Sequence, residues 1–139
     1  MLFKRIGGHT LPLPSQATPY SAGYDLRTSE DLYIPPQEYV VVQCGFAVAV
    51  PPGWVGQIWS RSGLGVKRIT TRAGIIDSDY RGELLVILVN ESESAWEATL
   101  GERIAQLVIT PCAHSIPEER DELPRTDRGE GGFGSTGSH

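Results

Sequence analysis

The feature that most limits the fold of this chain is an alternation of side-chain size along residues 40–50. The even positions carry the larger apolar side chains of Val40, Val42, Cys44, Phe46, Val48 and Val50. The odd positions carry Val41, Gln43, Gly45, Ala47 and Ala49. Because successive side chains of a strand point to opposite faces, this period of two predicts a strand with one buried face. Pro35-Pro36 before it and Pro51-Pro52-Gly53 after it set its limits.

Three further segments are predicted strands. Residues 54–60 form a short apolar run, and residues 101–110 form a longer one interrupted by Gln106. Residues 84–89 are continuously apolar, which predicts a strand buried on both faces, inside a sandwich or at a subunit contact. No long amphipathic helix is evident. Short strands separated by Gly and Pro therefore predict an all-β sandwich or barrel with at most one short helix.

Size and charge narrow the functional classes. A chain of 139 residues is one domain by the usual size range, and a domain this small gains stability from association with copies of itself. The formal charge of -5 gives no support for general binding to nucleic acids or membranes. An anionic ligand would therefore need a local basic patch.

The two cysteines and the N-terminus indicate the compartment. Cys44 lies inside the predicted strand, so a buried free thiol is expected, although a disulfide with Cys112 stays open. The first residues lack the apolar core of a signal peptide, and no apolar run approaches about 20 residues. We expect a soluble cytoplasmic protein, and a nuclear or viral origin is equally compatible.

Residues 73–83, with the sequence AGIIDSDYRGE, carry the strongest chemical signal. The glycines Gly74 and Gly82 favour a bend that would bring Asp77 and Tyr80 to one pocket. A carboxylate beside an aromatic ring can orient a water molecule next to a flat ligand. Asp and Gly in this pattern are also typical of an ordinary hairpin turn.

A basic patch precedes this segment. Arg61, Lys67, Arg68 and Arg72 fall within twelve residues that contain no acid. A short helix from about residue 62 to residue 68, capped by Ser60 or Ser62, would bind an anion, and the alternative is a solvated basic loop. Gln106 is either a satisfied core amide or a ligand-facing one, and Asp25 alone reads as a turn or cap residue.

The C-terminal residues RTDRGEGGFGSTGSH are rich in Gly and Ser, as flexible linkers are. Arg128 at the head of this run and Phe133 between glycines argue for a role in binding. Backbone N–H groups together with Ser135 and Thr136 could wrap phosphates. The segment lacks the strand and helix of a Rossmann fingerprint or a P-loop.

Five ordered segments, SAGYDL, SRSGLG, AGIIDSDYRGE, GERIAQL and RGEGGFGSTG, resemble the motifs of trimeric deoxyuridine triphosphate nucleotidohydrolases, the dUTPases. The resemblance covers nearly the whole chain. It implies a jelly-roll-like β-barrel over residues 1–124, a glycine-rich arm over 125–139, and a homotrimer whose three active sites each use residues of all subunits. It also implies Mg²⁺-dependent hydrolysis of dUTP to dUMP and pyrophosphate, which limits uracil in DNA and supplies dUMP for dTMP synthesis.

The resemblance also assigns roles to residues around the reacting end of the substrate. Asp77 matches the carboxylate that activates the attacking water. Tyr80 matches the aromatic that packs under deoxyribose and excludes a 2′-hydroxyl. The hairpin with Thr71, Gly74 and Ile76 matches the element that reads uracil through backbone groups. Asp79 is left as a structural residue that bonds the turn.

The remaining roles concern the phosphates and the metal. Asp25 matches the acid that holds Mg²⁺ through its water shell, with the triphosphate as the main ligand. The phosphate and arm positions that match the family are Arg61, Ser62, Gly63, Gln106, Arg128, Phe133, Gly134, Ser135 and Thr136, with Phe133 stacking over uracil. The second motif departs from the family in Ser60 and Gly65, where Pro and Ala are common, and Thr71 replaces an Asn of some relatives.

Two rival functions belong to the same scaffold. A dCTP deaminase needs a carboxylate to move protons at C4 of cytosine, and the position that carries it in those relatives holds Ile87 here. A non-catalytic nucleotide sensor is the other rival, and the presence of Asp77, Arg61 and the arm argues against it.

Overall fold

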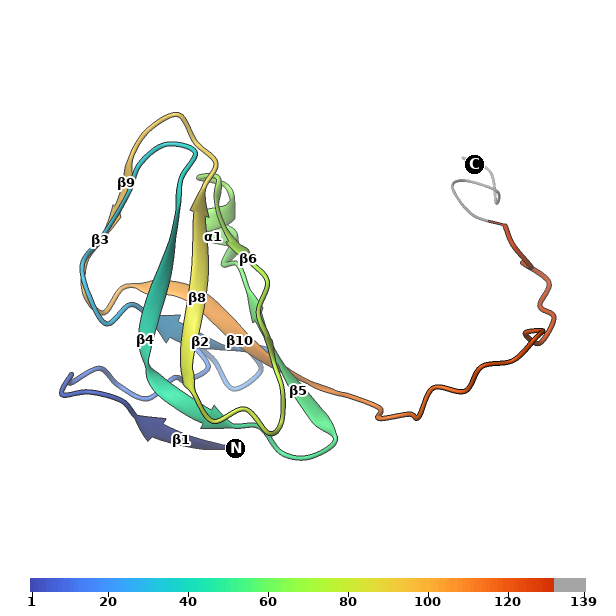
Figure 1. The fold of residues 1–139 in the computed structure, drawn as a ribbon. Helices are drawn as coiled ribbons and strands as arrows, with labels where there is room; N and C mark the ends of the chain where they lie inside the picture. Colours follow the sequence, from blue (N-terminus) through green and yellow to red (C-terminus); the bar gives the residue numbers. More distant parts are fainter. Residues whose placement is uncertain (132–139) are drawn as a thin grey trace.

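The computed structural model describes residues 1–131; residues 132–139, including Phe133, Gly134, Ser135 and Thr136, lie outside the described part. Two four-stranded antiparallel sheets and one strand pair make up the fold (Figure 1). The first sheet has the order β1 (Leu2–Arg5), β4 (Tyr39–Ala49), β8 (Glu83–Asn90) and β6 (Ile69–Arg72). The second has the order β2 (Gly23–Arg27), β10 (Arg103–Pro111), β5 (Trp54–Trp59) and β7 (Ile75–Ile76). The pair joins β3 (Leu32–Ile34) to β9 (Trp96–Ala98).

The core lies between the two sheets. The even positions of β4 point into it, and Val42, Cys44, Phe46 and Val48 are each at most 2% exposed. Leu107 of β10, which is fully buried, joins Val42, Cys44 and Val48 in the core from the second sheet. The predicted strand and its buried face are therefore confirmed, and with them the all-β, jelly-roll-like fold.

Strand β8 differs from the expectation for residues 84–89. Leu84, Val86 and Leu88 are fully buried, but Leu85 is 43% exposed and Ile87 is half-buried. Burial on both faces is wrong for the single chain, because only one side of β8 faces the second sheet. Its outer side presents Leu85 and Ile87 beside Val41 of β4, and these three apolar side chains line a cavity on this face of the sheet.

A bulge interrupts β4 where the alternation of the sequence is unbroken. The pairing with β8 shifts register between Gln43 and Ala47, and Gly45 in the gap has a φ of 72°. Only glycine adopts this backbone conformation without strain. The side chain of His9 also lies over Gly45, where a Cβ atom would come within 2.1 Å of its Nε2 atom.

The expected helix is shorter than residues 62–68. Helix α1 spans Ser62–Gly65, begins at the N-cap Arg61, and has no side-chain cap. Ser60 and Ser62 are therefore not caps. Instead, the hydroxyl of Ser60 accepts a hydrogen bond from the backbone N–H of Thr71 at 2.8 Å. The helix stops early because two glycines in one turn lower its helix propensity.

The remaining features concern the cysteines, the surface and the tail. Both cysteines are free, and Cys44 is buried as predicted.

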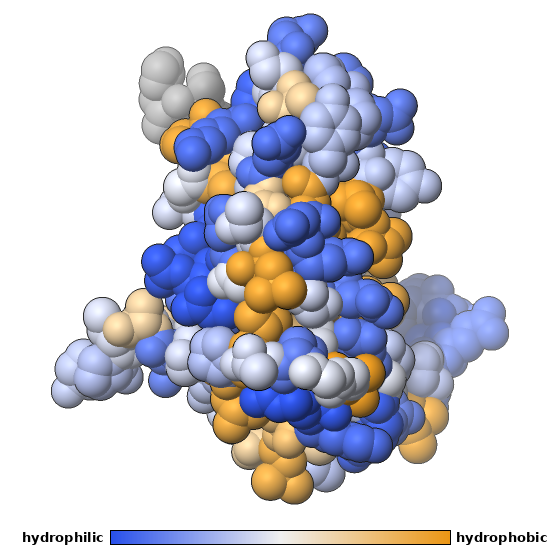
Figure 2. All heavy atoms as spheres, turned by 90° about the vertical axis from the view of Figure 1, so that its left-hand side faces the viewer, coloured by the Kyte–Doolittle hydropathy of each residue, from blue (hydrophilic) through white to orange (hydrophobic). Residues whose placement is uncertain are grey.

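Apolar patches on the face shown in Figure 2 are separated by hydrophilic residues. After β10, residues 112–131 are almost all exposed, and Figure 1 shows them running away from the sheets. Within residues 1–131, no helix has the length and apolar character needed to cross a membrane.

Candidate active site

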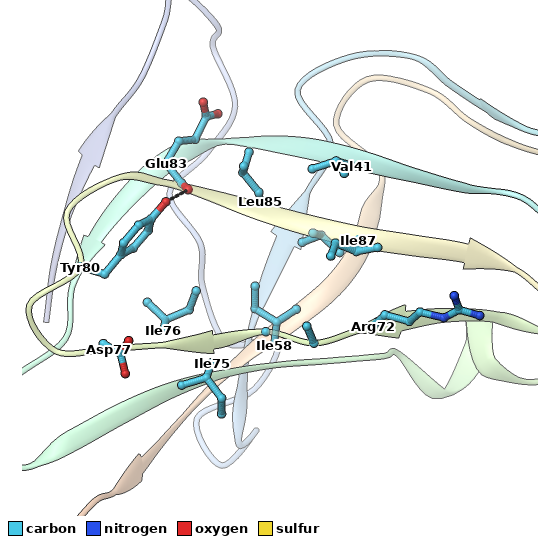
Figure 3. A pocket seen from close by; sticks show the side chains of 13 residues that line it. Val41, Ile58, Arg72, Ile75, Ile76, Asp77, Tyr80, Glu83, Leu85 and Ile87 are labelled. Carbon is cyan, nitrogen blue, oxygen red and sulfur yellow. Dashed lines mark hydrogen bonds between the residues drawn. The ribbon is translucent and has the colours of Figure 1, made fainter. Parts of the chain in front are cut away.

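A tight turn carries Asp77 and Tyr80 to one cavity. The backbone N–H of Tyr80 donates to the carbonyl of Asp77 at 3.1 Å, which closes the turn between β7 and β8. Both residues line a cavity of about 290 Å³, together with Gly74 and Ile76 (Figure 3). The segment is therefore a turn, and it also brings a carboxylate and an aromatic ring together. The hairpin turn and the meeting of Asp77 with Tyr80 are thus both present, and the role in orienting a water molecule stays a prediction.

The ring of Tyr80 is fixed by its neighbours in the chain. Its hydroxyl donates to the carbonyl of Glu83 at 3.0 Å. The ring folds back over Gly82, where a Cβ atom would lie 2.3 Å from the hydroxyl oxygen. A side chain at residue 82 would therefore displace the ring.

Arg81, and not Asp79, braces this turn. The Arg81 guanidinium donates to the carbonyls of Ser78 and Tyr80, both at 2.7 Å. Asp79 is exposed, and its side chain makes no hydrogen bond within the described part of the chain. The structural role expected for Asp79 is thus filled by the guanidinium, whose longer side chain reaches both carbonyls.

The hairpin between β6 and β7 is held against β5. Ala73 and Gly74 reverse the chain with φ values of 57° and 122°, and the carbonyl of Gly74 accepts from the N–H of Ile58 at 2.8 Å. A Cβ atom at Gly74 would lie 2.6 Å from that of Ile58. Thr71 and Ser60 join their hydroxyls at 3.0 Å. A second hollow, lined by Thr71, Gly74 and parts of β5, lies beside the first cavity.

A separate cluster forms where β2, β10 and α1 meet. Asp25 and Gln106 are direct partners across β2 and β10. The carboxylate of Asp25 forms an ion pair with Arg61, whose Nε atom lies 3.3 Å from it, and accepts a hydrogen bond from an Arg103 guanidinium nitrogen at 3.1 Å. Gln106 is half-buried and donates to the carbonyl of Ser60 at 3.0 Å. Asp25 is thus a strand residue in a charged cluster, and neither a turn nor a cap residue.

Arg103 is the member of this cluster that sequence reasoning missed. It lies three positions before Gln106 in the segment GERIAQL, and a strand puts alternate residues on the same face, so spacing alone gave no signal. The bulge between Arg103 and Ala105 shifts the register, so that the Arg103 side chain reaches Asp25 on the same side of the sheet as Gln106. Two guanidiniums against one carboxylate leave an excess positive charge, which suits an anionic ligand. Ser62 and Gly63 are exposed at the adjoining start of α1.

A magnesium ion fits this cluster only indirectly. No group of three or more Cys, His, Asp or Glu side chains within residues 1–131 could hold a metal by itself. Asp25 is a single carboxylate already paired with two arginines. Because Mg²⁺ keeps several waters and takes phosphate oxygens as ligands, such a donor set fits a water-mediated contact to an ion carried by the substrate.

The two groups of site residues are separate within one chain. Neither Asp25, Arg61 nor Gln106 lines the cavity that contains Asp77 and Tyr80. Arg128 lies in the exposed tail and donates to the carbonyl of Gly131 at 2.8 Å. Phe133, Gly134, Ser135 and Thr136 fall outside the described residues.

Comparison with known proteins decides the family. The family model described as dUTPase matches residues 9–137. The chain belongs to the dUTPase family. A deoxyuridine 5′-triphosphate nucleotidohydrolase of Anaplasma marginale is 43% identical over 142 residues, covering 99% of this chain and 97% of the relative. The corresponding protein of Candida albicans is 45% identical over 130 residues, covering 91% and 82%.

Solved dUTPases share the fold. The Staphylococcus bacteriophage 80alpha dUTPase with dUpNHpp superimposes with a TM-score of 0.92 at 30% identity, covering 98% of this chain and 97% of that one. A point mutant of the dUTPase from phage phi11 of S. aureus, described as revealing how a structural Mg(II) ion is coordinated, has a TM-score of 0.82 at 24% identity, covering 90% and 100%. The family expected from the five motifs is confirmed.

Proposed function

We propose that this chain hydrolyses dUTP to dUMP and pyrophosphate by attack of water on the α-phosphorus. The observation that carries the proposal is the cavity in which the Asp77 carboxylate and the Tyr80 ring meet. The relatives named deoxyuridine 5′-triphosphate nucleotidohydrolase support the same reaction.

Asp77 would accept the proton of the attacking water. Its carboxylate is exposed at the turn, so a water molecule can reach it. Direct attack by water on a phosphorus atom needs a positioned base and neutralised phosphate charge, and it needs no covalent intermediate. Tyr80 would pack under the deoxyribose, where a 2′-hydroxyl would clash with the ring. The hairpin with Thr71, Gly74 and Ile76 would bind uracil.

The cluster at Asp25 would bind the triphosphate. Arg61, Ser62, Gly63 and Gln106 are the proposed phosphate contacts, and Arg103 adds a second guanidinium beside Arg61. Asp25 would hold the water shell of Mg²⁺, which when bound neutralises the phosphate charge that develops during the reaction. Its pairing with two arginines keeps the carboxylate at a fixed place until the anionic substrate arrives.

We further propose that the active form is a homotrimer. The separation of the Asp77 cavity from the Asp25 cluster on one chain supports a site completed by a neighbouring copy. The outer apolar surface of β4 and β8 supports the same assembly. The proposed organisation is a barrel over residues 1–124 and an arm over 125–139. Arg128, Phe133, Gly134, Ser135 and Thr136 of that arm would close over the nucleotide. A cytoplasmic location stays a prediction from the sequence.

A deaminase is disfavoured by the lining of the cavity. Ile87 of β8 lines the same cavity as Asp77. An aliphatic side chain cannot transfer the protons that deamination at C4 of cytosine requires.

Pyrophosphate release in the presence of Mg²⁺ tests the proposal. The purified protein would be assayed side by side with dUTP, dCTP, dTTP and UTP. We expect turnover of dUTP alone, because both the base and the sugar are selected. Ammonia release from dCTP would assign the deaminase reaction instead. Tight binding of dUTP without turnover of any nucleotide would indicate a nucleotide sensor.

A further inference from the structure

The bulge at Gly45 is held from the side of the N-terminal segment. The carbonyl of Gly45 accepts hydrogen bonds from the N–H of Ile6 at 2.8 Å and from His9 Nε2 at 2.7 Å. His9 Nδ1 faces two donors, the N–H of Leu11 at 3.2 Å and an Arg5 guanidinium nitrogen at 2.9 Å. Since Nδ1 therefore accepts, the ring proton lies on Nε2 and the ring is a donor to Gly45. The imidazole also packs edge-on against Phe46, with 5.0 Å between ring centroids.

Glu83 holds the bulge from the opposite side. The register of β4 against β8 jumps from the pair Gln43–Leu85 to the pair Ala47–Glu83, so the ladder is interrupted at Gly45. The Glu83 carboxylate takes the place of a ladder carbonyl and accepts from the N–H of Gly45 at 2.8 Å. Removing this carboxylate would leave the buried N–H of Gly45 without a hydrogen-bond partner.

Glu83 also fixes Tyr80 through its backbone. It is the first residue of β8, three positions after Tyr80, and its carbonyl accepts from the Tyr80 hydroxyl at 3.0 Å. Figure 3 shows this bond at the edge of the cavity, with the Glu83 side chain pointing away from Asp77. The Glu83 carboxylate thus bonds the start of β8 to β4, and the Glu83 carbonyl bonds the Tyr80 hydroxyl.

We propose that Glu83 is a positioning residue for sugar selectivity, acting through Tyr80. Its carboxylate anchors the start of β8 to the Gly45 bulge, and this anchor keeps the Tyr80 ring where a 2′-hydroxyl would clash. The inference rests on the proposed hydrolysis of dUTP. A steric wall discriminates against an added hydroxyl only as well as the wall is held in place. If the start of β8 were free to move, the Tyr80 ring could shift away from the 2′-hydroxyl, and a ribonucleotide would bind more readily.

The test compares kcat/KM for dUTP and UTP in variants of the full-length protein. In Glu83→Ala we expect the preference for dUTP to fall by about tenfold, a loss of part of the rejection that a steric wall provides. Glu83→Asp should act in the same direction, because the shorter side chain withdraws the carboxylate from Gly45. Glu83→Gln should keep the preference, since its amide oxygen can accept the same hydrogen bond.

A double mutant separates positioning from general destabilisation. Tyr80→Phe removes the hydroxyl that Glu83 holds, so adding Glu83→Ala to it should lower the preference little further. Glu97→Ala, at an exposed glutamate on β9, is the matched control and should leave the preference unchanged. Thermal unfolding of each variant checks that it is folded.

The outcomes are distinct from those of the proposed function. If the unmodified protein does not hydrolyse dUTP, the proposed function fails and the inference fails with it. If it does, and both Glu83→Ala and Glu83→Asp lower turnover of dUTP and UTP equally, Glu83 is only structural. Loss of preference in Glu83→Gln equal to that in Glu83→Ala would also overturn the inference, because the hydrogen bond would not be the cause.

Discussion

Asp77 combines an exposed carboxylate with a backbone that closes a turn. The turn uses the carbonyl of Asp77, not its side chain, so Asp77→Asn should keep the turn and remove the base. We expect turnover of dUTP to fall by about a hundredfold or more, with binding of a non-hydrolysable dUTP analogue little changed. Pyrophosphate release and equilibrium titration measure the two effects. Asp79→Asn is the control, and equal losses of binding and rate in Asp77→Asn would make Asp77 structural.

Cys44 links stability to alkaline pH. Burial, with a smaller contribution from the Glu83 charge, raises the pKa of its thiol from 9.0 to about 12. The unfolded chain loses this proton near pH 9 while the folded chain keeps it, so the free energy of unfolding should decrease as pH rises from 9.0 towards about 12. Chemical unfolding at pH 8 and pH 10 would measure the slope.

The Cys44 slope is isolated by comparison with variants. Cys44→Ala should lose less stability than the unmodified protein over that pH range, because it lacks the titrating thiol. Cys112→Ala is the matched control and should behave like the unmodified protein. Identical slopes in all three would show that the Cys44 thiol does not titrate differently on folding.

Among single residues, the sequence predicted the meeting of Asp77 and Tyr80 because both lie in one short segment. It missed Arg103 as a partner of Asp25, because their contact spans 78 positions and depends on a bulge in β10. It also assigned the bracing of the turn to Asp79, where the longer Arg81 side chain provides it. Contacts within a short segment can be predicted from the sequence, whereas contacts between side chains of different strands depend on the strand register.

The hairpin between β6 and β7 depends on Gly74. Its φ of 122° is unfavourable for other residues, and an added Cβ atom would lie 2.6 Å from that of Ile58. Gly74→Ala should therefore lower the free energy of unfolding by about 1–3 kcal/mol. Denaturant unfolding would measure the loss. Gly8→Ala is the matched control, because a Cβ atom at Gly8 meets no atom within 4 Å; equal effects in the two variants would contradict the expected strain.

We expect the barrel to fold without residues 128–139. The strands end at Pro111, and the described residues after it are almost all exposed. Deletion of residues 128–139 should leave the unfolding transition unchanged. It should reduce turnover of dUTP on the order of a hundredfold, because the hydrogen-bond donors that the arm would offer to the phosphates are lost. Normal turnover by the truncated protein would show that the arm is only a linker.

At the scale of elements, the sequence predicted the strands well where apolar and polar residues alternate. The bulge at Gly45 was invisible because Cys44 and Phe46 continue the alternation on both sides of it. The helix was overestimated at its C-terminal end, where two glycines stop it at Gly65, and Ser60, a good cap in isolation, bonds through its hydroxyl to Thr71 instead. In both places a long-range contact decides a local conformation.

For the whole molecule, the outer side of β8 is the proposed contact with a neighbouring copy. Leu85 is 43% exposed there, and covering the rest of it would contribute about 1 kcal/mol per chain. Leu85→Glu should therefore shift the protein from the proposed trimer to a monomer, while each barrel stays folded. Analytical ultracentrifugation and circular dichroism measure the two effects.

The control for assembly uses a different exposed side chain. Tyr33 on β3 is 62% exposed and lies in the separate strand pair, so Tyr33→Glu should leave the assembly unchanged. A trimeric Leu85→Glu variant would contradict the proposed contact. Under this proposal, the continuous apolar run of residues 84–89 would serve two neighbours, the second sheet of the same chain and a second copy.

The exposed tail after Pro111 makes this protein vulnerable to proteases. Arg120 and Arg125 lie in that tail, and exposed, strand-free segments are preferred sites of cleavage. A single cut there would detach Arg128 and everything after it while every strand of the barrel stayed in place. Under the proposed role of the arm, such a preparation would lose dUTP turnover during storage with no change in its melting curve, and the mass of the intact chain would reveal the cause.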